Sequence, residues 1–187
     1  MAIISPIMFL IAALSEPAVN LLFGEKWLGS VPYIQVLSWV AVLYPLHALN
    51  INALKVKDRS DLVLKIGFVK KAVSFSILVA SIPYGVFGIV VGQAVASTLA
   101  LVPNTYFCHR LVNYSLMEQV ADISKPLLSA MVAALCAWMV VQYMEAHDFV
   151  VLLASGLIGL LLYIITGLAV RSGGVLTILA QIKRRLV

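Results

Sequence analysis

Long apolar runs separated by short polar breaks dominate the pattern of hydrophobic and polar positions. A helix needs roughly 20 apolar residues to cross a hydrocarbon core of about 30 Å, and a backbone in lipid must satisfy its own hydrogen bonds. Six runs meet this length, approximately Ile3 to Phe23, Val31 to Leu54, Leu62 to Ile82, Val86 to Leu111, Pro126 to Met144 and Phe149 to Val170. The pattern predicts an all-α polytopic membrane protein with six transmembrane helices.

The breaks between these runs contain the residues that favour turns. They are Gly24 to Ser30, Asp58 to Asp61, Pro83 to Gly85, Asn113 to Lys125, and Glu145 to Asp148. We expect residues 1–170 to form one six-helix bundle.

Two further stretches have the spacing of short interfacial helices. Ser115 and Glu118 have capping-box spacing, and Leu116, Val120, Ile123 and Leu127 follow on one helix face. In residues 171–187 the same spacing recurs at Val175, Leu179, Ile182 and Leu186, opposite Lys183, Arg184 and Arg185. We expect both to lie along a membrane surface, the second as a cytoplasmic amphipathic basic tail.

Composition agrees with lipid as the main solvent. Apolar residues make up 63% of the 187 and charged residues 11%, whereas soluble domains have about half and a quarter. The net charge of +5 would suggest a nucleic-acid partner in a soluble protein, but its distribution is explained better by membrane topology, and we expect no nucleic acid. Cys108 and Cys136 are far apart and show no metal-ligand spacing, so we expect no metal, redox site or cofactor. The apolar start lacks a basic n-region and a cleavage site, which argues against a removable signal peptide.

The basic residues set the orientation, because loops rich in Lys and Arg stay in the cytoplasm. In an alternating six-span arrangement, 12 of the 13 Lys and Arg residues fall on one side, and Lys26 is the exception. Both termini are therefore predicted to be cytoplasmic.

Residues 20–61 and 103–111 carry an ordered set of motifs. The matching residues are Leu21, Leu22, Phe23, Gly24, Lys26, Trp27, Pro32, Ile34, Gln35, Leu37, Leu49, Asn50, Asn52, Arg59, Asp61, Pro103, Tyr106, Arg110 and Leu111. The chain resembles the Wzx-type polysaccharide flippases of the multidrug/oligosaccharidyl-lipid/polysaccharide exporter superfamily in these motifs, in the order of the motifs and in its predicted topology. It departs from the usual pattern at Ile51 and at Asp58, where glycine is common.

The resemblance implies one lobe of a two-lobe transporter, matching the last six of fourteen spans. The implied function is translocation of undecaprenyl-pyrophosphate-linked oligosaccharide across the bacterial inner membrane, by alternating access, for export of lipopolysaccharide or another surface polysaccharide. Membrane lipids and the lipid-linked oligosaccharide would be its partners. The abrupt apolar start suggests that an N-terminal lobe is missing and that the sequence is truncated.

Lys70 and Lys71 are the most informative charges. The 11 residues from Ala72 to the Pro83 turn make about 16 Å of helix, too short to cross the core, so both lysines lie at membrane depth. We hypothesise that they attract the pyrophosphate, in a substrate pathway with Lys65, Ser74, Asn50 and Asn52. The alternative is that both side chains snorkel towards cytoplasmic head groups.

Other polar residues have both a structural and a functional interpretation. Asn50 and Asn52 point about 200° apart on a helix, so one of them is expected to bond a neighbouring helix. Glu16 could couple proton movement or simply lie near the outer interface. The histidines are scattered and predict neither a metal cluster nor a catalytic pair.

Other classes of function remain open. A non-transporting remnant is consistent with the abrupt start, and a drug exporter would share the fold. A membrane enzyme would need an acid/base or nucleophile constellation, and the sequence offers no catalytic set.

Overall fold

The computed structural model describes residues 1–144 and 146–169, which form helices and turns without strands. The helices are α1 (Ile4–Ala13), α2 (Ser15–Phe23), η1 (Glu25–Ser30), α3 (Val31–Val56), α4 (Ser60–Ser81), η2 (Ile82–Tyr84), α5 (Gly85–Leu99), α6 (Leu101–Val112), α7 (Leu116–Tyr143) and α8 (Asp148–Ala169). The predicted basic tail, residues 171–187, lies outside the described residues.

Several helical segments have the length and composition of membrane spans. Among the described residues there are four such segments, or five if the bent pair α1 and α2 forms one span. They are Glu25–Val56, Ser60–Val112, Leu116–Tyr143 and Asp148–Ala169. The protein is therefore a polytopic helical membrane protein, as the apolar runs predict.

The chain divides into two compact units. Among the described residues, unit 1 contains residues 1–38, 123–144 and 146–169, and unit 2 contains residues 39–122. The chain passes from one unit to the other within α3 and again within α7.

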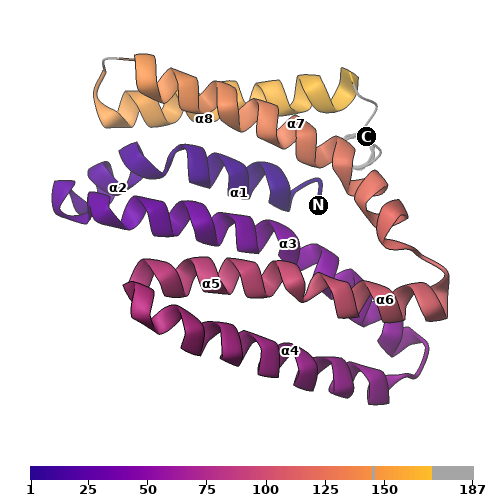
Figure 1. Cartoon of the computed structure of the whole chain (residues 1–187). Coiled ribbons are helices and arrows are strands. Elements are labelled where there is room, and N and C mark those ends of the chain that lie inside the picture. Colours follow the sequence, from indigo (N-terminus) through magenta and orange to yellow (C-terminus); the bar gives the residue numbers. More distant parts are fainter. Residues whose placement is uncertain (145, 170–187) are drawn as a thin grey trace. The chain divides into compact units, whose positions relative to one another are not determined.

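Unit 1 is organised around α8, which packs against α1 and α2 (Figure 1). Its core contains Ala130 and Ala133 of α7 and Tyr163 of α8. The Tyr163 hydroxyl donates a hydrogen bond to the carbonyl of Ala2 at 2.7 Å, which satisfies this buried polar group. A side chain at Gly159 would meet Leu10 and Ala137, so this glycine permits close packing of α8.

The first predicted span, Ile3 to Phe23, is not one straight helix. It is divided at Leu14 into α1 and α2, which bend by 67°. Pro17 lacks the N–H that would continue the ladder to Ala13, and the Ser15 hydroxyl donates to the carbonyl of Ala12 at 2.8 Å. The uninterrupted helix that the apolar run predicts is therefore wrong.

Helix α7 joins two elements that the sequence predicts as separate. The capping box is confirmed, because Ser115 Oγ accepts the N–H of Glu118 at 3.3 Å and Glu118 Oε2 accepts the N–H of Ser115 at 2.7 Å. The prediction of a separate interfacial helix there is wrong, because α7 continues through Pro126. A proline removes one backbone donor, and a membrane helix can continue across it.

Unit 2 is built on a helical hairpin, in which the chain reverses at η2 and α4 lies along α5 (Figure 1). Gly85 begins α5 with a φ of 69°, a left-handed conformation that favours glycine. Next to the turn, a Cβ at Gly92 would collide with the Ser81 hydroxyl and touch Ile77. Gly92 therefore allows the two helices to pack closely at this end of the hairpin.

Because Gly92 has no space for a methyl group, Gly92→Ala is expected to destabilise the folded protein by about 1–3 kcal/mol. Gly67→Ala is the matched control, because a Cβ at Gly67 meets no atom within 4 Å and alanine favours helix. The measurement is unfolding of the detergent-solubilised protein followed by circular dichroism. Equal midpoints for G92A and G67A would contradict the close packing.

Candidate functional site

Lys70 and Lys71 lie halfway along α4. This helix has 22 residues and a length of about 33 Å, so each lysine is more than two turns from either end. Lys70 is half-buried and Lys71 is exposed. Adjacent residues on a helix point about 100° apart, so the two lysine side chains project from different sides of α4.

Lys70 lines a polar cavity of about 410 Å³ within unit 2. The cavity is bounded by α3, α4 and α5. Its other lining residues are Tyr44, His47, Ala48, Ile51, Asn52, Lys55, Ser74, Gln93, Ala96, Ser97 and Ala100. Amide, hydroxyl, imidazole and ammonium groups together give this space several hydrogen-bond donors.

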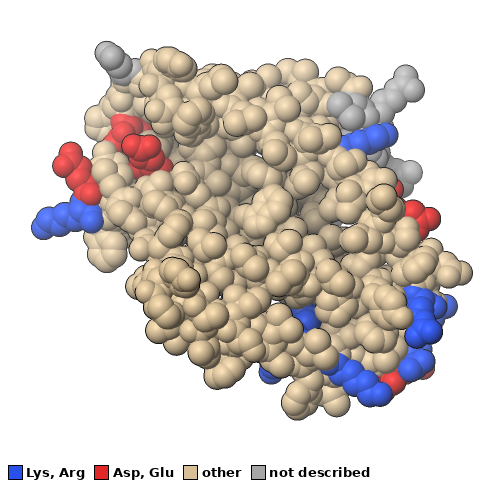
Figure 2. All heavy atoms as spheres, in the orientation of Figure 1, with Lys and Arg blue, Asp and Glu red and all other residues tan. Residues whose placement is uncertain are grey.

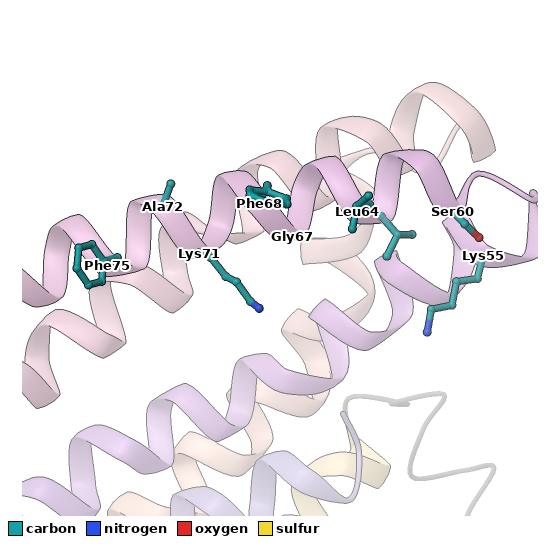
Figure 3. Close-up of a pocket in the computed structure, with 9 residues that line it drawn as sticks. Lys55, Ser60, Leu64, Gly67, Phe68, Lys71, Ala72 and Phe75 are labelled. Carbon is teal, nitrogen blue, oxygen red and sulfur yellow. The ribbon is translucent and has the colours of Figure 1, made fainter.

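Two neighbouring cavities contain Lys71. One, of about 650 Å³, is lined by Lys70, Lys71, Ser74 and Gln93 together with Phe75 and Leu78. The other, of about 700 Å³, lies between α4 and the end of α3 (Figure 3). In Figure 3 the side chain of Lys71 points from α4 towards α3, and Lys55 extends from the end of α3. The three cavities share lining residues, so Lys55, Lys70 and Lys71 line neighbouring cavities.

No acidic side chain is among the residues that line these three cavities, as far as the described chain shows. Lys and Arg side chains also gather around the turn between α3 and α4, with acidic side chains among them, on a surface that is otherwise mostly uncharged (Figure 2). Positive charge that no nearby carboxylate neutralises attracts anions. The region is therefore suited to binding a group with negative charge.

His47 joins α3 to α5 and α6 at the wall of the polar cavity. Asn104 Nδ2 donates to His47 Nδ1 at 2.8 Å, and His47 Nε2 faces Ser97 Oγ at 3.4 Å. With Nδ1 accepting, the imidazole proton lies on Nε2. These bonds hold the imidazole ring in place on the α3 side of the cavity.

Asn50 and Asn52 have different surroundings, as their spacing predicts. Asn50 is fully buried, and its Nδ2 donates to Gln119 Oε1 of α7 at 2.9 Å. Asn52 is exposed and lines the polar cavity. The structure therefore brings Asn52 together with Lys70 and Ser74, and gives Asn50 the role of joining two helices.

Lys65 is exposed on α4 and is not among the residues lining the three basic cavities. Glu16 lies in unit 1, where it lines a separate cavity of about 200 Å³ that also contains Asp148. There Asn20 Nδ2 donates to Asp148 Oδ2 at 2.6 Å.

The motif residues at the turns mainly determine the backbone conformation there. Gly24 follows α2 with a φ of 83°, and its carbonyl accepts the N–H of Trp27 at 3.0 Å. Lys26 and Trp27 are exposed. Gly24 thus ends one helix and begins η1.

The turn before α4 has a similar backbone constraint. Asp58 has a φ of 54°, and the N–H of Arg59 bonds the carbonyl of Leu54 at 3.1 Å, as in a Schellman motif. A left-handed residue explains why glycine would suit this position. Arg59 Nε donates to Asp61 Oδ1 at 2.9 Å, and this hydrogen bond raises the pKa of Arg59 above its ordinary value.

Sequence reasoning missed three residues of the site. The sequence explains Lys55 by topology alone, shows His47 as one of three scattered histidines, and gives Gln93 no distinguishing pattern. His47 precedes Asn50 by three residues, so both fall on one face of α3, and this shared face was the available signal. Among the described residues no group of three or more His, Cys, Asp or Glu is arranged to hold a metal ion.

Comparison with known proteins gives a sparse result. No family model matches the chain, and no solved structure matches it. An uncharacterized membrane protein of Methanocaldococcus jannaschii is 22% identical over 118 residues, which are 63% of this chain and 23% of that protein. The match thus spans about a quarter of a relative that is more than twice as long as this chain.

Because Asn50 is the donor to a fully buried Gln119, Asn50→Ala is expected to cost about 1–3 kcal/mol of stability. Asn52→Ala is the control, and its exposed position predicts a change within about 0.5 kcal/mol. Thermal unfolding in detergent measures both. An N50A protein as stable as N52A would show that the bond between α3 and α7 contributes nothing.

Proposed function

We propose that this chain is the C-terminal lobe of a flippase that translocates undecaprenyl-pyrophosphate-linked oligosaccharide for surface polysaccharide export. The observation that carries the proposal is the position of Lys70 and Lys71, halfway along a helix of membrane length and lining cavities with Lys55. Ionisable residues inside membrane segments commonly mark a substrate or ion pathway.

The chemistry of the cavity favours an anionic and hydrated ligand. Lysine ammonium groups are compact point charges that bind phosphate oxygens, and Asn52, Ser74 and Gln93 add neutral hydrogen-bonding groups. A pyrophosphate would be drawn to the lysines, and the hydroxyls of a sugar match the neutral groups. Translocation needs no covalent chemistry, so no enzyme activity is proposed.

The sequence motifs support the choice of this family. The turn at Asp58, where the family often has glycine, has a left-handed backbone, and Gly24 also has a positive φ. The length of the Methanocaldococcus relative is compatible with a second lobe. In the two-lobe arrangement that the resemblance implies, the lobes would rock about a hydrophilic cavity while the lipid tail stays in the bilayer.

We further propose six crossings, with both termini in the cytoplasm of a bacterial inner membrane. The segment Ser60–Val112 has 53 residues, about 80 Å of helix, which is far more than one crossing needs. The reversal at η2 divides it into α4 and the pair α5 and α6. With α3, α7, α8 and the bent pair α1 and α2, this gives six.

The proposed topology predicts which side of the membrane each turn faces. Single cysteines at Lys57 and Asn113, introduced in a background without Cys108 and Cys136, should react with an impermeant maleimide only after the cytoplasmic side is opened. A cysteine at Tyr84 should react from the opposite side. Labelling of all three positions from one side would contradict the hairpin crossing.

The main test is binding of undecaprenyl-pyrophosphate-linked oligosaccharide to the full chain in lipid nanodiscs. Lys70→Gln with Lys71→Gln should weaken binding at least about tenfold, because the two lost charge pairs together are worth at least about 1.4 kcal/mol. Lys57→Gln is the control, since this exposed lysine lies in the turn before α4. Equal affinity of the double variant and K57Q would overturn the proposal.

Two further measurements separate the alternatives. The lipophilic cation tetraphenylphosphonium should not compete, and its preferential binding would favour a drug exporter. Movement of a fluorescent lipid-linked oligosaccharide between the leaflets of proteoliposomes tests transport directly. Binding without movement would mean that this chain alone is a non-transporting lobe.

A further inference from the structure

An apolar cavity lies beside the polar one in unit 2. It has a volume of about 520 Å³ and is lined by residues of α4, α5 and α6, among them Val69, Val73, Leu99, Val102, Pro103 and Tyr106. Several of these side chains, such as Val102, are exposed at the surface of the described chain. The cavity is therefore an apolar groove that is open to the surroundings of the helices.

Lys70 is the charged residue among those that line this groove. It also lines the polar cavity and the cavity that contains Lys71, so one lysine side chain borders the apolar groove with its aliphatic stem and also reaches two basic cavities. Ala96 in α5 and Ala100, directly after α5, likewise line both the groove and the polar cavity. The small alanine side chains and the lysine thus form the boundary between the two environments.

From this arrangement we propose that the groove binds the hydrocarbon chain of a polyprenyl diphosphate, with the diphosphate held at Lys70 and Lys71. The inference rests on the proposed function and adds to it the place of the lipid chain. A ligand that is apolar along its length and strongly anionic at one end matches the groove and the basic cavities together. Because the bilayer already keeps the chain out of water, the groove would add to the affinity of the head group through van der Waals packing along the chain.

Charge favours a diphosphate over an ordinary phospholipid. Lys55, Lys70 and Lys71 line the neighbouring basic cavities, and no acidic residue lines them within the described chain. A phosphodiester head group carries a single negative charge, whereas a diphosphate ester carries more than one. Because the cluster can neutralise several charges, the diphosphate ester is the better complement.

The test compares three probes on the full chain in phosphatidylcholine nanodiscs: inorganic diphosphate, geranylgeranyl diphosphate and dioleoyl phosphatidylglycerol. The wild-type chain should bind geranylgeranyl diphosphate more tightly than inorganic diphosphate. Val73→Trp fills the groove, so it should weaken binding of geranylgeranyl diphosphate about tenfold and leave inorganic diphosphate unchanged. Val79→Trp is the matched control, because Val79 is exposed on the same helix and is not among the groove residues.

The variants separate the possible failures. Val102→Trp places bulk on the α6 side of the groove and should reproduce the effect if V73W loses helix content by circular dichroism. Unchanged binding of geranylgeranyl diphosphate in both groove variants would overturn the inference while leaving the head-group site intact. Equal competition by dioleoyl phosphatidylglycerol would assign the groove to bulk phospholipid. If neither diphosphate binds the wild-type chain, the proposed function itself fails.

Discussion

An ammonium group halfway along a membrane helix must be stabilised by water, by an anion or by neutral side chains that accept its hydrogen bonds. Insertion of such a lysine costs about 2.5–3.5 kcal/mol when the surroundings are hydrocarbon. α4 has two of them in succession, and the hairpin is arranged to accommodate them. Near the turn, Gly92 brings α5 close to Ser81. Further along, Gln93 and Ser97 of α5 face a cavity shared with Lys70. The hairpin is thus tight at its apolar end and hollow beside its charges.

The wall opposite the lysines is held by side-chain hydrogen bonds. His47 and Asn50 lie one turn apart on α3 and bond Asn104 of α6 and Gln119 of α7. In an apolar environment a polar side chain without a partner is costly, so these pairs fix which residues of α3 meet the neighbouring helices. Apolar contacts alone would restrain rotation of α3 less, because they are not directional. The polar pairs therefore determine that Asn52 faces the cavity.

The sequence predicted the features that depend on local rules. Apolar length predicted the helices, capping-box spacing predicted the start of α7, and turn residues predicted the breaks at Gly85 and Asn113, where the backbone is left-handed. It also predicted that Asn50 and Asn52 would have different partners. It did not predict where a proline interrupts a helix, because that depends on how the surrounding residues compensate for the lost hydrogen bond. Pro17 lies close to a sharp bend, whereas α7 continues through Pro126. It could not predict that Lys55 shares one cavity with Lys70 and another with Lys71, because that depends on how α3 and α4 pack. His47 was missed for the same reason, since its partners are 50 and 57 residues further along the chain.

The choice of lysine over arginine in these cavities agrees with transport rather than permanent binding. A guanidinium holds phosphate through a fixed pair of hydrogen bonds, whereas an ammonium on a flexible stem acts as a mobile point charge. The charged residues lining the three basic cavities, within the described chain, are Lys55, Lys70 and Lys71. A transported ligand must be bound well enough to enter and loosely enough to leave. Flexible lysines facing a wall fixed by His47 and its partners meet both conditions, because the charge can follow the ligand while the cavity keeps its form.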